Sequence, residues 1–431
     1  MKLTIFWFRR DLRLDDNKGL YYALCKSTPV LPLFIFDENI TGQLPADDHR
    51  IGFIYNSVLD LDNALRATGS GLLVKKGKPM DVFQVLTREY EIEAVVANAD
   101  HEPYGIGRDS DIEKFLRAKN IIFERHWDHL IMPPDKLLNN SSLPYTVFTP
   151  YSKKWKSSVQ PQHLKSYSSE NHPHKYYRGE LPQLGPLEKW GFLPASFTVP
   201  KPVFHREKLM NYAANRDFPA IDGTTRLGLH LRFGNISIRR IAMMAKEVNE
   251  TFLNELIWRE FYASVLYHYP SAVSQAFKKQ YDNIQWLNHE EHFDLWKNGQ
   301  TGFPLVDAGM RELKATGWMH NRVRMVVAGF LTKHLLIDWR WGEAWFAGLL
   351  FDFELSSNNG GWQWCAGSGT DAAPYFRIFN PEAQQAKFDP NFSYIKKWIP
   401  EFGSSSYPKP MVDLAAARER CLEAYKSALN T

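Results

Sequence analysis

The chain has very few cysteines for its length. Only Cys25, Cys365 and Cys421 occur among 431 residues, and none has a partner at the spacing of a metal-ligand or disulfide motif. The pattern disfavours a disulfide-stapled secreted fold, and we expect no metal site. A reducing compartment is the simplest interpretation.

Long apolar runs and a targeting segment are also missing. No stretch is apolar for long enough to span a bilayer. The N-terminus enters LTIFWF without a basic segment, a long apolar core and a small-residue cleavage site. We therefore expect a cytoplasmic protein with no membrane partner.

Excess charge of one sign is absent as well. The 52 basic and 48 acidic residues leave a net charge of only +4. This excludes a protein that, like a histone, neutralises nucleic acid through a large overall positive charge. It permits a local basic face toward nucleic acid.

A complete glycine fingerprint for dinucleotides is lacking too. Gly105-Ile106-Gly107 has no third glycine and does not follow the first predicted strand. This disfavours a nucleotide site there.

What the chain does have is enough length for two domains. Residues 1–130 alternate apolar runs with helical periods, which predicts a Rossmann-like, doubly wound parallel α/β sheet. The predicted strands are Leu3 to Phe8, Val30 to Phe36, Leu72 to Val74, Ala94 to Ala97 and Ile121 to Phe123. The predicted helices lie near Lys18 to Lys26, Asp48 to Ala67, Met80 to Tyr90 and Asp109 to Ala118.

The rest of the chain changes character twice. Residues 131–205 are rich in Pro, Ser, Lys and His, which predicts a long connector. Residues 206–431 show helical periods without a strand signal, which predicts an all-α domain.

Four clusters in the helical part carry chemistry. The first, residues 217–234, has a turn at Asp222-Gly223 and then Thr224, Thr225 and Arg226 before a helix. Such a helix start can hold a phosphate. An ordinary threonine N-cap is the commoner interpretation of this cluster alone.

The second cluster follows one helix face. Glu255, Trp258, Arg259 and Tyr262 stand at i, i+3, i+4 and i+7. A strip that mixes aromatic and charged groups suits a ligand pocket. An internal pair between Glu255 and Arg259 remains an equal alternative.

The remaining clusters are rich in tryptophan. GWMHNRVRM, residues 317–325, puts Trp318, Arg322 and Met325 on one face. FDFELSSNNGGWQW, residues 351–364, offers Asp352 and an Asn-Asn-Gly-Gly turn that lets the backbone approach a flat ligand. Core packing is the commoner role of any single tryptophan. The four clusters together favour redox chemistry beside a polyanion.

In order, these motifs closely resemble the photolyase/cryptochrome family, especially the class I cyclobutane pyrimidine dimer (CPD) photolyases. WFRRDLRLDDN at 7–17 is similar to the family's N-terminal signature. ATGWMHNRVRM, LLIDWR and NNGGWQW are similar to its C-terminal ones. The resemblance runs essentially from end to end and implies an FAD-binding helical domain and light-driven DNA repair.

The resemblance also implies roles for individual residues. Tyr212 and the run from Thr224 to Gly228 match the surroundings of the FAD phosphates, although Gly228 replaces the family's usual serine and Phe252 stands where tryptophan is common. Arg324 and Asp352 match an ion pair beside the flavin ring, and Asn358 matches the group at flavin N5. The positions that match FAD-binding residues are Tyr212, Thr224, Thr225, Arg226, Leu227, Gly228, Phe252, Glu255, Arg259, Trp318, Asn321, Arg324, Asp352, Glu354 and Asn358.

At the lesion the resemblance implies that Glu255 hydrogen-bonds the pyrimidine while Trp258 and Met325 pack against it, so Glu255, Trp258, Met325 and Asn358 are the expected catalytic residues. Excited reduced FAD would give an electron to a flipped-out dimer and then recover it. Trp362, Trp339 and Trp286 match the tryptophans that relay electrons to oxidised FAD. The positions that match DNA-binding residues are Arg216, Trp258, Arg259, Asn321, Arg322, Arg377 and Gln384.

Several alternatives stay open. A 6-4 photolyase would carry histidine in place of Met325 and of Asn321, whereas a cryptochrome would be a photoreceptor; plant-type cryptochromes carry aspartate in place of Asn358. A flavin-free helical nucleic-acid-binding module is a third class. The loop DHEPYGIGRD resembles deazaflavin-type antenna sites more than folate-type ones, and an empty antenna site is also open. The expected partner is DNA with pyrimidine dimers, bound by a monomer without protein partners.

Overall fold

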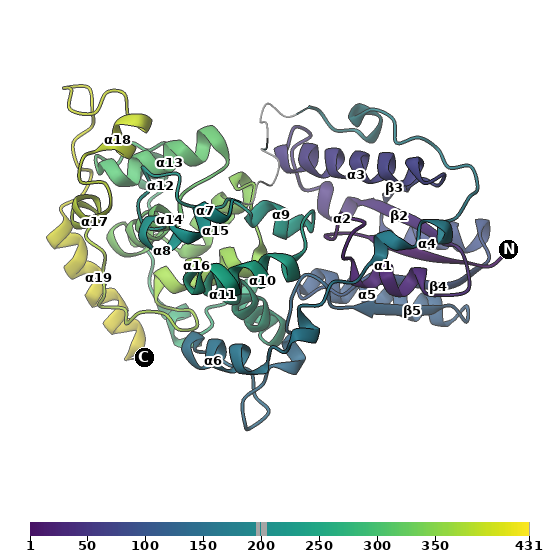
Figure 1. Cartoon of the computed structure of the whole chain (residues 1–431). Coiled ribbons are helices and arrows are strands. Elements are labelled where there is room, and N and C mark those ends of the chain that lie inside the picture. Colours follow the sequence, from purple (N-terminus) through teal and green to yellow (C-terminus); the bar gives the residue numbers. More distant parts are fainter. Residues whose placement is uncertain (195–198, 200–204, 431) are drawn as a thin grey trace. The chain divides into compact units, whose positions relative to one another are not determined.

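The computed structural model describes residues 1–194, 199 and 205–430, to which all structural statements below refer (Figure 1). Residues 195–198 and 200–204 of the expected connector, and Thr431, lie outside the described residues. The chain forms two compact units, called unit 1 and unit 2 below.

A five-stranded parallel sheet is the centre of unit 1, and its strand order is β3-β2-β1-β4-β5. The sequence predicted all five strands, with both ends of β1 exact and the other ends within three residues. The strands are β1 (Leu3–Phe8), β2 (Val30–Asp37), β3 (Leu73–Gly77), β4 (Ile92–Asn98) and β5 (Ile122–His126).

Helices cover both faces of this sheet, as predicted for a doubly wound fold. Phe6 and Phe8 pack into one apolar cluster with α1 (Lys18–Leu24) and α3 (His49–Ala67). Ile5 and Trp7 pack into another with α4 (Pro79–Glu89) and α5 (Pro103–Arg117). Successive side chains of a strand point to opposite faces, so β1 contributes to both clusters. The DHEPYGIGRD segment is mostly the first turns of α5 rather than a loop, with Pro103 at the first helical position.

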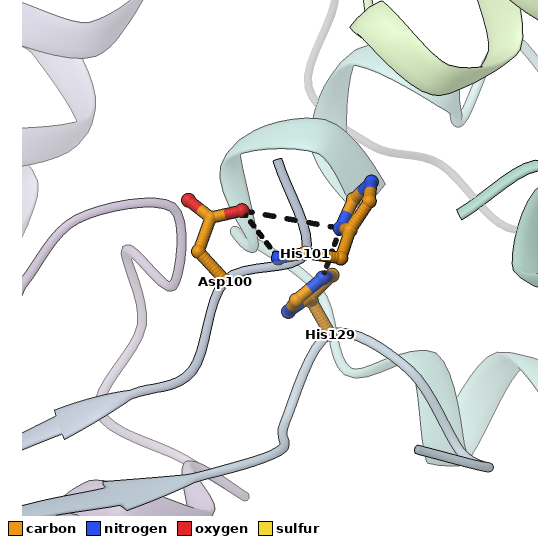
Figure 2. A group of neighbouring side chains, drawn as sticks. All are labelled: Asp100, His101 and His129. Carbon is orange, nitrogen blue, oxygen red and sulfur yellow. Dashed lines mark hydrogen bonds and ion pairs between the residues drawn. The ribbon is translucent and has the colours of Figure 1, made fainter. Parts of the chain in front are cut away.

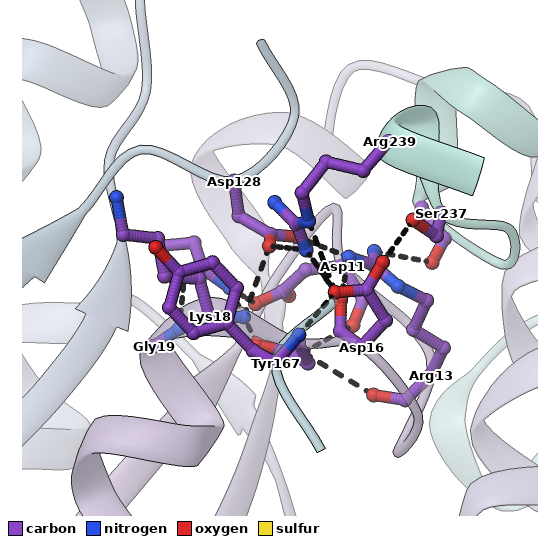
Figure 3. Close-up of polar contacts among 12 residues, drawn as sticks. Asp11, Arg13, Asp16, Lys18, Gly19, Asp128, Tyr167, Ser237 and Arg239 are labelled. Carbon is purple, nitrogen blue, oxygen red and sulfur yellow. Dashed lines mark hydrogen bonds and ion pairs between the residues drawn. The ribbon is translucent and has the colours of Figure 1, made fainter. Parts of the chain in front are cut away.

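The N-terminal motif at 7–17 builds a buried polar network in unit 1. Figure 3 shows Arg239, from α10 (Ile238–Val248), reaching Asp16 and Asp128, each at 2.8 Å. Arg13 binds the other oxygen of Asp128 at 2.5 Å. Although burial opposes ionisation, Arg13 and Arg239 hold the pKa of Asp128 below its ordinary value. The network therefore joins the loops after β1 and β5 to α10, whose Arg239 lies 223 residues after Asp16 and 111 residues after Asp128.

Unit 2 is built from helices, as predicted. Its largest apolar core joins α13, α14, α15 and α16 around Trp296, Phe330 and Trp362. The main helices are α11 (Glu250–His268), α12 (Glu290–Lys297), α13 (Pro304–Thr316), α14 (Asn321–Gly329), α15 (Trp339–Leu349), α16 (Leu355–Ala366), α17 (Pro381–Phe388), α18 (Ser393–Trp398) and α19 (Leu414–Leu429).

Shorter elements connect these parts. Most of them are single turns with few buried residues. They are α2 (Glu38–Thr41), η1 (Pro134–Lys136), α6 (Phe148–Ser158), η2 (Pro161–His163), η3 (Ser169–Asn171), η4 (Pro173–Lys175), η5 (Leu187–Trp190), α7 (Arg206–Met210), α8 (Tyr212–Asn215), α9 (Gly228–Phe233), η6 (Pro270–Val273), η7 (Lys279–Asn283) and the π-helical turn η8 (Phe330–His334).

The two units are not consecutive in the sequence. Leu137–Lys154 belongs to unit 2, although it lies inside the predicted connector. Leu227–Glu247 belongs to unit 1, although it lies inside the predicted helical domain. The consecutive limits 1–130, 131–205 and 206–431 therefore describe the organisation only coarsely, because segments distant in sequence complete each core.

A buried lysine lies in the π-helical turn of unit 2. Lys333 is only 3% exposed, and its ammonium lies 3.7 Å from the centre of the Tyr425 ring on α19. Burial lowers the pKa of Lys333 to about 8. Among the described residues, no helix has both the length and the apolar character needed to cross a membrane.

Candidate active site

An open cavity of about 390 Å³ lies in unit 2 between side chains of α11, α14, α16 and the segment before α16. Many residues singled out from the sequence line it. They are Arg216, Glu255, Trp258, Arg259, Asn321, Arg324, Met325, Asp352, Glu354, Asn358 and Trp362. The cavity thus collects the predicted catalytic residues and part of the predicted flavin set at one place.

The strip predicted on α11 is confirmed. Glu255, Trp258, Arg259 and Tyr262 all line the cavity from that helix. Asn249 caps the helix by accepting a hydrogen bond from the Phe252 amide at 3.1 Å. The cap and the i, i+3, i+4, i+7 spacing together aim the strip at one side.

Glu255 does not pair with Arg259 on its own helix. It pairs instead with Arg216, which ends α8 and also lines the cavity. Burial raises the pKa of Glu255, and the attraction of Arg216 opposes this rise. Glu255 is therefore a partly buried carboxyl group beside one cation, suited to hydrogen-bond a polar ring.

Arg259 is engaged from the other side. Its Nε and Nη2 donate to the two oxygens of Glu354 at 3.0 and 2.9 Å. This fork fixes the plane of the guanidinium. The pair ties α11 to the start of α16, for which Glu354 is the N-cap residue.

A second arginine forms the ion pair predicted between Arg324 and Asp352. Arg324 Nη2 lies 3.0 Å from both oxygens of Asp352, and its Nε donates to the Met319 carbonyl at 2.8 Å. These bonds hold the guanidinium at the cavity wall. A fixed cation there can offset a negative charge on a bound ring.

Asn358 is oriented by a neighbour that the sequence did not reveal. Its Nδ2 donates to Glu343 Oε1 at 2.7 Å and to the Glu343 carbonyl at 3.2 Å. Burial raises the pKa of Glu343, while the bond from Asn358 acts against that rise. Because the amide nitrogen is engaged, Asn358 offers a ligand its carbonyl oxygen.

The thioether of Met325 is held between two side chains. Asn321 Nδ2 lies 4.0 Å and Arg322 Nη1 lies 3.8 Å from its sulfur. Trp318 precedes α14 and stacks on Phe351 at 6.0 Å, so it does not share the helix face of Arg322 and Met325. That part of the predicted strip was wrong, because the helix begins only at Asn321.

Phe148 is a neighbour of Trp258 that sequence analysis missed. Its ring lies parallel to the Trp258 indole, with centroids 3.7 Å apart and an interplanar angle of 4°. Its backbone N–H donates to Asp371 Oδ2 at 3.3 Å. Phe148 comes from the first quarter of the predicted connector, where no local signal indicated a contact with α11.

The Asn-Asn-Gly-Gly turn predicted at 358–361 was wrong. These residues lie inside the continuous helix α16. Gly360 lets α16 approach α11 closely, because a Cβ at this position would lie 2.2 Å from the Tyr262 ring. A Cβ at Gly361 would have no atom within 4 Å. Helical packing against α11 explains the glycine, not a turn.

Other residues, to which the sequence analysis assigned no individual site role, also line the cavity. They include apolar residues that a sequence pattern assigns equally well to the core. They are Ala328, Phe346, Leu350, Phe353, Ser357, Gly361, Trp364 and Cys365.

The residues predicted around the FAD phosphates do not line this cavity. Tyr212 and Phe252 are buried and meet edge to face at 5.1 Å. Thr224 and Thr225 cap no helix, since α9 has Leu227 as N-cap without a side-chain bond. Leu227 and Gly228 belong to unit 1, and Arg226 ends a segment of unit 2 with a left-handed φ of 52°.

The cavity fits a flavin ring by its chemistry. Indole, phenyl and aliphatic walls offer apolar contact, while Arg324, Asp352 and Asn358 supply a cation, an anion and an acceptor. Arg259 and Glu354 add a second fixed ion pair at the same cavity.

The three predicted relay tryptophans have graded environments. Trp362 lines the cavity and is 3% exposed, Trp339 is 2% exposed, and Trp286 is only partly buried against the core. Gly342 permits the contact between α15 and α16, since a Cβ there would lie 2.1 Å from Trp362.

The remaining predicted DNA-binding residues do not line this cavity. Arg322 pairs with Asp217 at 2.7 Å and lies 4.3 Å from the Phe388 ring centre. Arg377 lines a small neighbouring pocket with Trp364 and Cys365. Gln384 lies on α17.

Comparisons with known proteins agree with the cavity. Residues 252–405 match the FAD binding domain of DNA photolyase, and residues 4–170 match the DNA photolyase domain. A deoxyribodipyrimidine photo-lyase of Synechococcus sp. is 36% identical over 95% of this chain and 93% of its own length.

Solved structures are similar over the whole chain. A class III photolyase of Agrobacterium tumefaciens has a TM-score of 0.90 at 33% identity and covers 100% of this chain and 98% of its own. A cryptochrome of Synechocystis sp. has a TM-score of 0.87 at 25% identity, over 98% of this chain and 99% of its own. The closer resemblance to class I thus stays a prediction. The full-length similarity and the cavity show that the chain belongs to the DNA photolyase family.

Proposed function

We propose that this protein repairs cyclobutane pyrimidine dimers in DNA with light, using FAD bound in the helical unit. One observation carries the proposal. A single cavity holds the flavin-type set Arg324, Asp352 and Asn358 next to Glu255 and Trp258. A flavin and a damaged base pair step bound there would be neighbours.

Three residues suit a reduced flavin. When bound, reduced FAD excited by light supplies the electron that opens the cyclobutane ring, and it takes the electron back afterwards. Arg324 offsets the negative charge of the ring. Asn358, turned by Glu343, accepts a hydrogen bond from a protonated ring nitrogen without adding charge. Asp352 holds Arg324 in place.

Another set suits the lesion. Glu255 hydrogen-bonds the pyrimidine edge, and Trp258 stacks on the dimer with the indole face that Phe148 leaves uncovered. Met325 fills the remaining apolar contact. Photolyases are among the enzymes that extrude the target base, and a damaged step costs less to unstack.

DNA binding extends this surface through phosphate contacts. We assign Arg216, Arg259, Arg322 and Arg377 to the DNA, together with Gln384, Asn321 and Trp258. Arginine binds phosphate bidentately. Affinity for damaged DNA therefore falls steeply as salt rises.

Trp362, Trp339 and Trp286 relay electrons from the protein surface to oxidised flavin. Their exposure supports this order, because the first lines the cavity, the second is buried and the third is partly exposed. The FAD phosphates are assigned to Tyr212, Thr224, Thr225, Arg226, Leu227 and Gly228, with Phe252 and Trp318 packing nearby.

A second pigment, if present, is of the deazaflavin type rather than folate. The polar groups at the carboxyl ends of β1, β2 and β4 support a site there. The guanidinium groups of Arg9 and Arg108 lie over the Trp7 ring, at 4.9 and 4.8 Å from its centre, and Tyr104 donates to Asp37 at 2.6 Å. Pigment extraction after expression in hosts with and without deazaflavin synthesis tests this; a bound folate would contradict it.

The decisive test is light-dependent repair. Photoreduced protein is incubated with an oligonucleotide that carries one thymine dimer, in blue light and in darkness. We expect intact thymines only in the light, and a strong loss of repair in Glu255→Ala. No repair by a yellow, reducible protein would contradict the proposal and favour 6-4 repair or a cryptochrome photoreceptor.

The protein acts as a monomer without protein partners, which light scattering of the purified chain tests. Its cytoplasmic location stays a prediction.

A further inference from the structure

A cluster of two histidines and one aspartate lies in unit 1, and none of the three residues lines the cavity described above. Figure 2 shows Asp100, His101 and His129 turned toward one another. His101 Nδ1 lies 2.8 Å from His129 Nε2 and 3.9 Å from Asp100 Oδ1. All three donor atoms lie within 4.8 Å of one another.

The sheet topology explains why these residues meet. Asp100 and His101 follow β4, and His129 follows β5, the neighbouring strand. The carboxyl ends of parallel strands lie at one edge of a sheet, where loops from adjacent strands converge. The histidines are enclosed, with exposures of 0% and 6%.

We propose that Asp100, His101 and His129 bind one divalent transition-metal ion of the zinc class. Two imidazole nitrogens and one carboxylate oxygen suit Zn²⁺, Co²⁺ or Ni²⁺, whereas Mg²⁺ and Ca²⁺ prefer oxygen donors. Metal–ligand distances of about 2.0–2.2 Å put neighbouring donors roughly 3 Å apart. The separations of 2.8 and 3.9 Å, with all three donor atoms within 4.8 Å of one another, need shifts of about 1–2 Å to reach such a shell.

The surroundings already orient the carboxylate as a ligand. Asp100 Oδ1 accepts the backbone N–H of His101 at 2.8 Å and of Glu102 at 3.1 Å. Hydrogen bonds of this kind commonly hold metal ligands in place. Arg10 also reaches this carboxylate, at 3.3 Å from Asp100 Oδ1, and it pairs with Glu102 at 2.9 Å.

The alternative is a metal-free hydrogen bond between two neutral rings. Metal binding needs only that each ring carry its proton on the nitrogen that faces away from the ion. The ion would then join the loops after β4 and β5, a role independent of the repair site.

Metal content of the full-length, FAD-loaded protein tests the proposal. The protein is treated with a chelator, dialysed with Zn²⁺ and then passed through a desalting column. We expect one zinc per chain by elemental analysis, and a Zn²⁺ affinity at least about tenfold lower in His129→Gln and His101→Gln. Flavin content of each variant verifies that it is folded.

A surface histidine pair supplies the matched control. His289 and His292 lie 5.1 Å apart between ring centres in unit 2. His292→Gln should keep the zinc. The proposal would be overturned if His292→Gln lost its zinc while His129→Gln kept it. It would also be overturned if the wild-type chain retained no zinc.

A wild-type measurement covers the case in which the variants fail to fold. Cu²⁺ bound in place of Zn²⁺ should show coupling to two imidazole nitrogens by electron paramagnetic resonance. Coupling to none or to one would contradict the assignment.

Discussion

Replacing the buried Lys333 by methionine should stabilise the helical unit at neutral pH. Burial lowers the pKa of Lys333 from 10.5 to about 8. A difference of that size corresponds to about 3 kcal/mol of penalty on the charged form. The contact with the Tyr425 ring, at 3.7 Å, stabilises the charged ammonium by roughly 1–2 kcal/mol. We therefore expect Lys333→Met to be more stable by about 1–2 kcal/mol near pH 7.

The pH dependence gives a sharper signature. Between about pH 8 and 10.5 the native chain has released this proton while the unfolded chain still binds it. Stability rises with pH wherever the unfolded state binds more protons. From about pH 8 to 10.5 the free energy of unfolding of the wild type should thus increase by about 3 kcal/mol relative to that of the variant. Buried tyrosines affect both proteins equally and cancel in the difference.

Urea unfolding at several pH values measures this difference. Near-ultraviolet dichroism of the buried tryptophans follows unfolding of the chain, and the midpoints of wild type and variant are compared at each pH. Lys387→Met is the control, because Lys387 is exposed beside the Phe388 ring and should change stability by less than about 0.5 kcal/mol. Parallel pH profiles for wild type and Lys333→Met would refute the reasoning.

Four further predictions concern the active unit. Phe148→Leu removes the stack behind the lesion-facing tryptophan and should weaken binding of dimer-containing DNA about fivefold, whereas Phe148→Tyr should bind normally by fluorescence anisotropy; equal losses would contradict a stacking role. Asn358→Asp adds a carboxylate beside the flavin and should lower the reduction potential of the flavin by at least about 30 mV in a spectroelectrochemical titration. An unchanged reduction potential would mean that residue 358 does not lie beside the flavin. Trp339→Phe should slow photoreduction of oxidised flavin while chemically reduced enzyme still repairs, and equal loss of both would argue against the relay. Gly360→Ala should destabilise the protein by roughly 1–3 kcal/mol in thermal unfolding, whereas Gly348→Ala, with open space around its Cβ, should stabilise it by up to about 1 kcal/mol; similar effects of both would remove the packing argument.

The sheet could be predicted because each of its strands carries its own apolar signal. LTIFWF at residues 3–8 supplies both faces of β1, and similar runs mark the other strands. Periodicity of this kind is local and survives without knowledge of the partner. The same holds for the α11 strip, whose spacing alone put Glu255 and Trp258 on one face.

Partner choice could not be predicted, because it depends on where distant segments meet. Glu255 could pair with Arg259 four residues away or with Arg216, and only the tertiary structure selects Arg216. The stacking of Phe148 and the engagement of Asn358 by Glu343 have the same origin. At 358–361 the composition favoured a turn, but packing against Tyr262 made a helix.

The exchange of segments between the units has a consequence during synthesis. Domains generally fold as their chains leave the ribosome, N-terminal part first. Here the α/β sheet is translated long before Arg239, whose guanidinium neutralises Asp16 and Asp128 inside it. Until that residue emerges, two buried carboxylates lack one of their cations. The buried network of the sheet therefore stays incomplete while part of the helical unit is already being synthesised. For the same reason, no single proteolytic cut could release either unit intact.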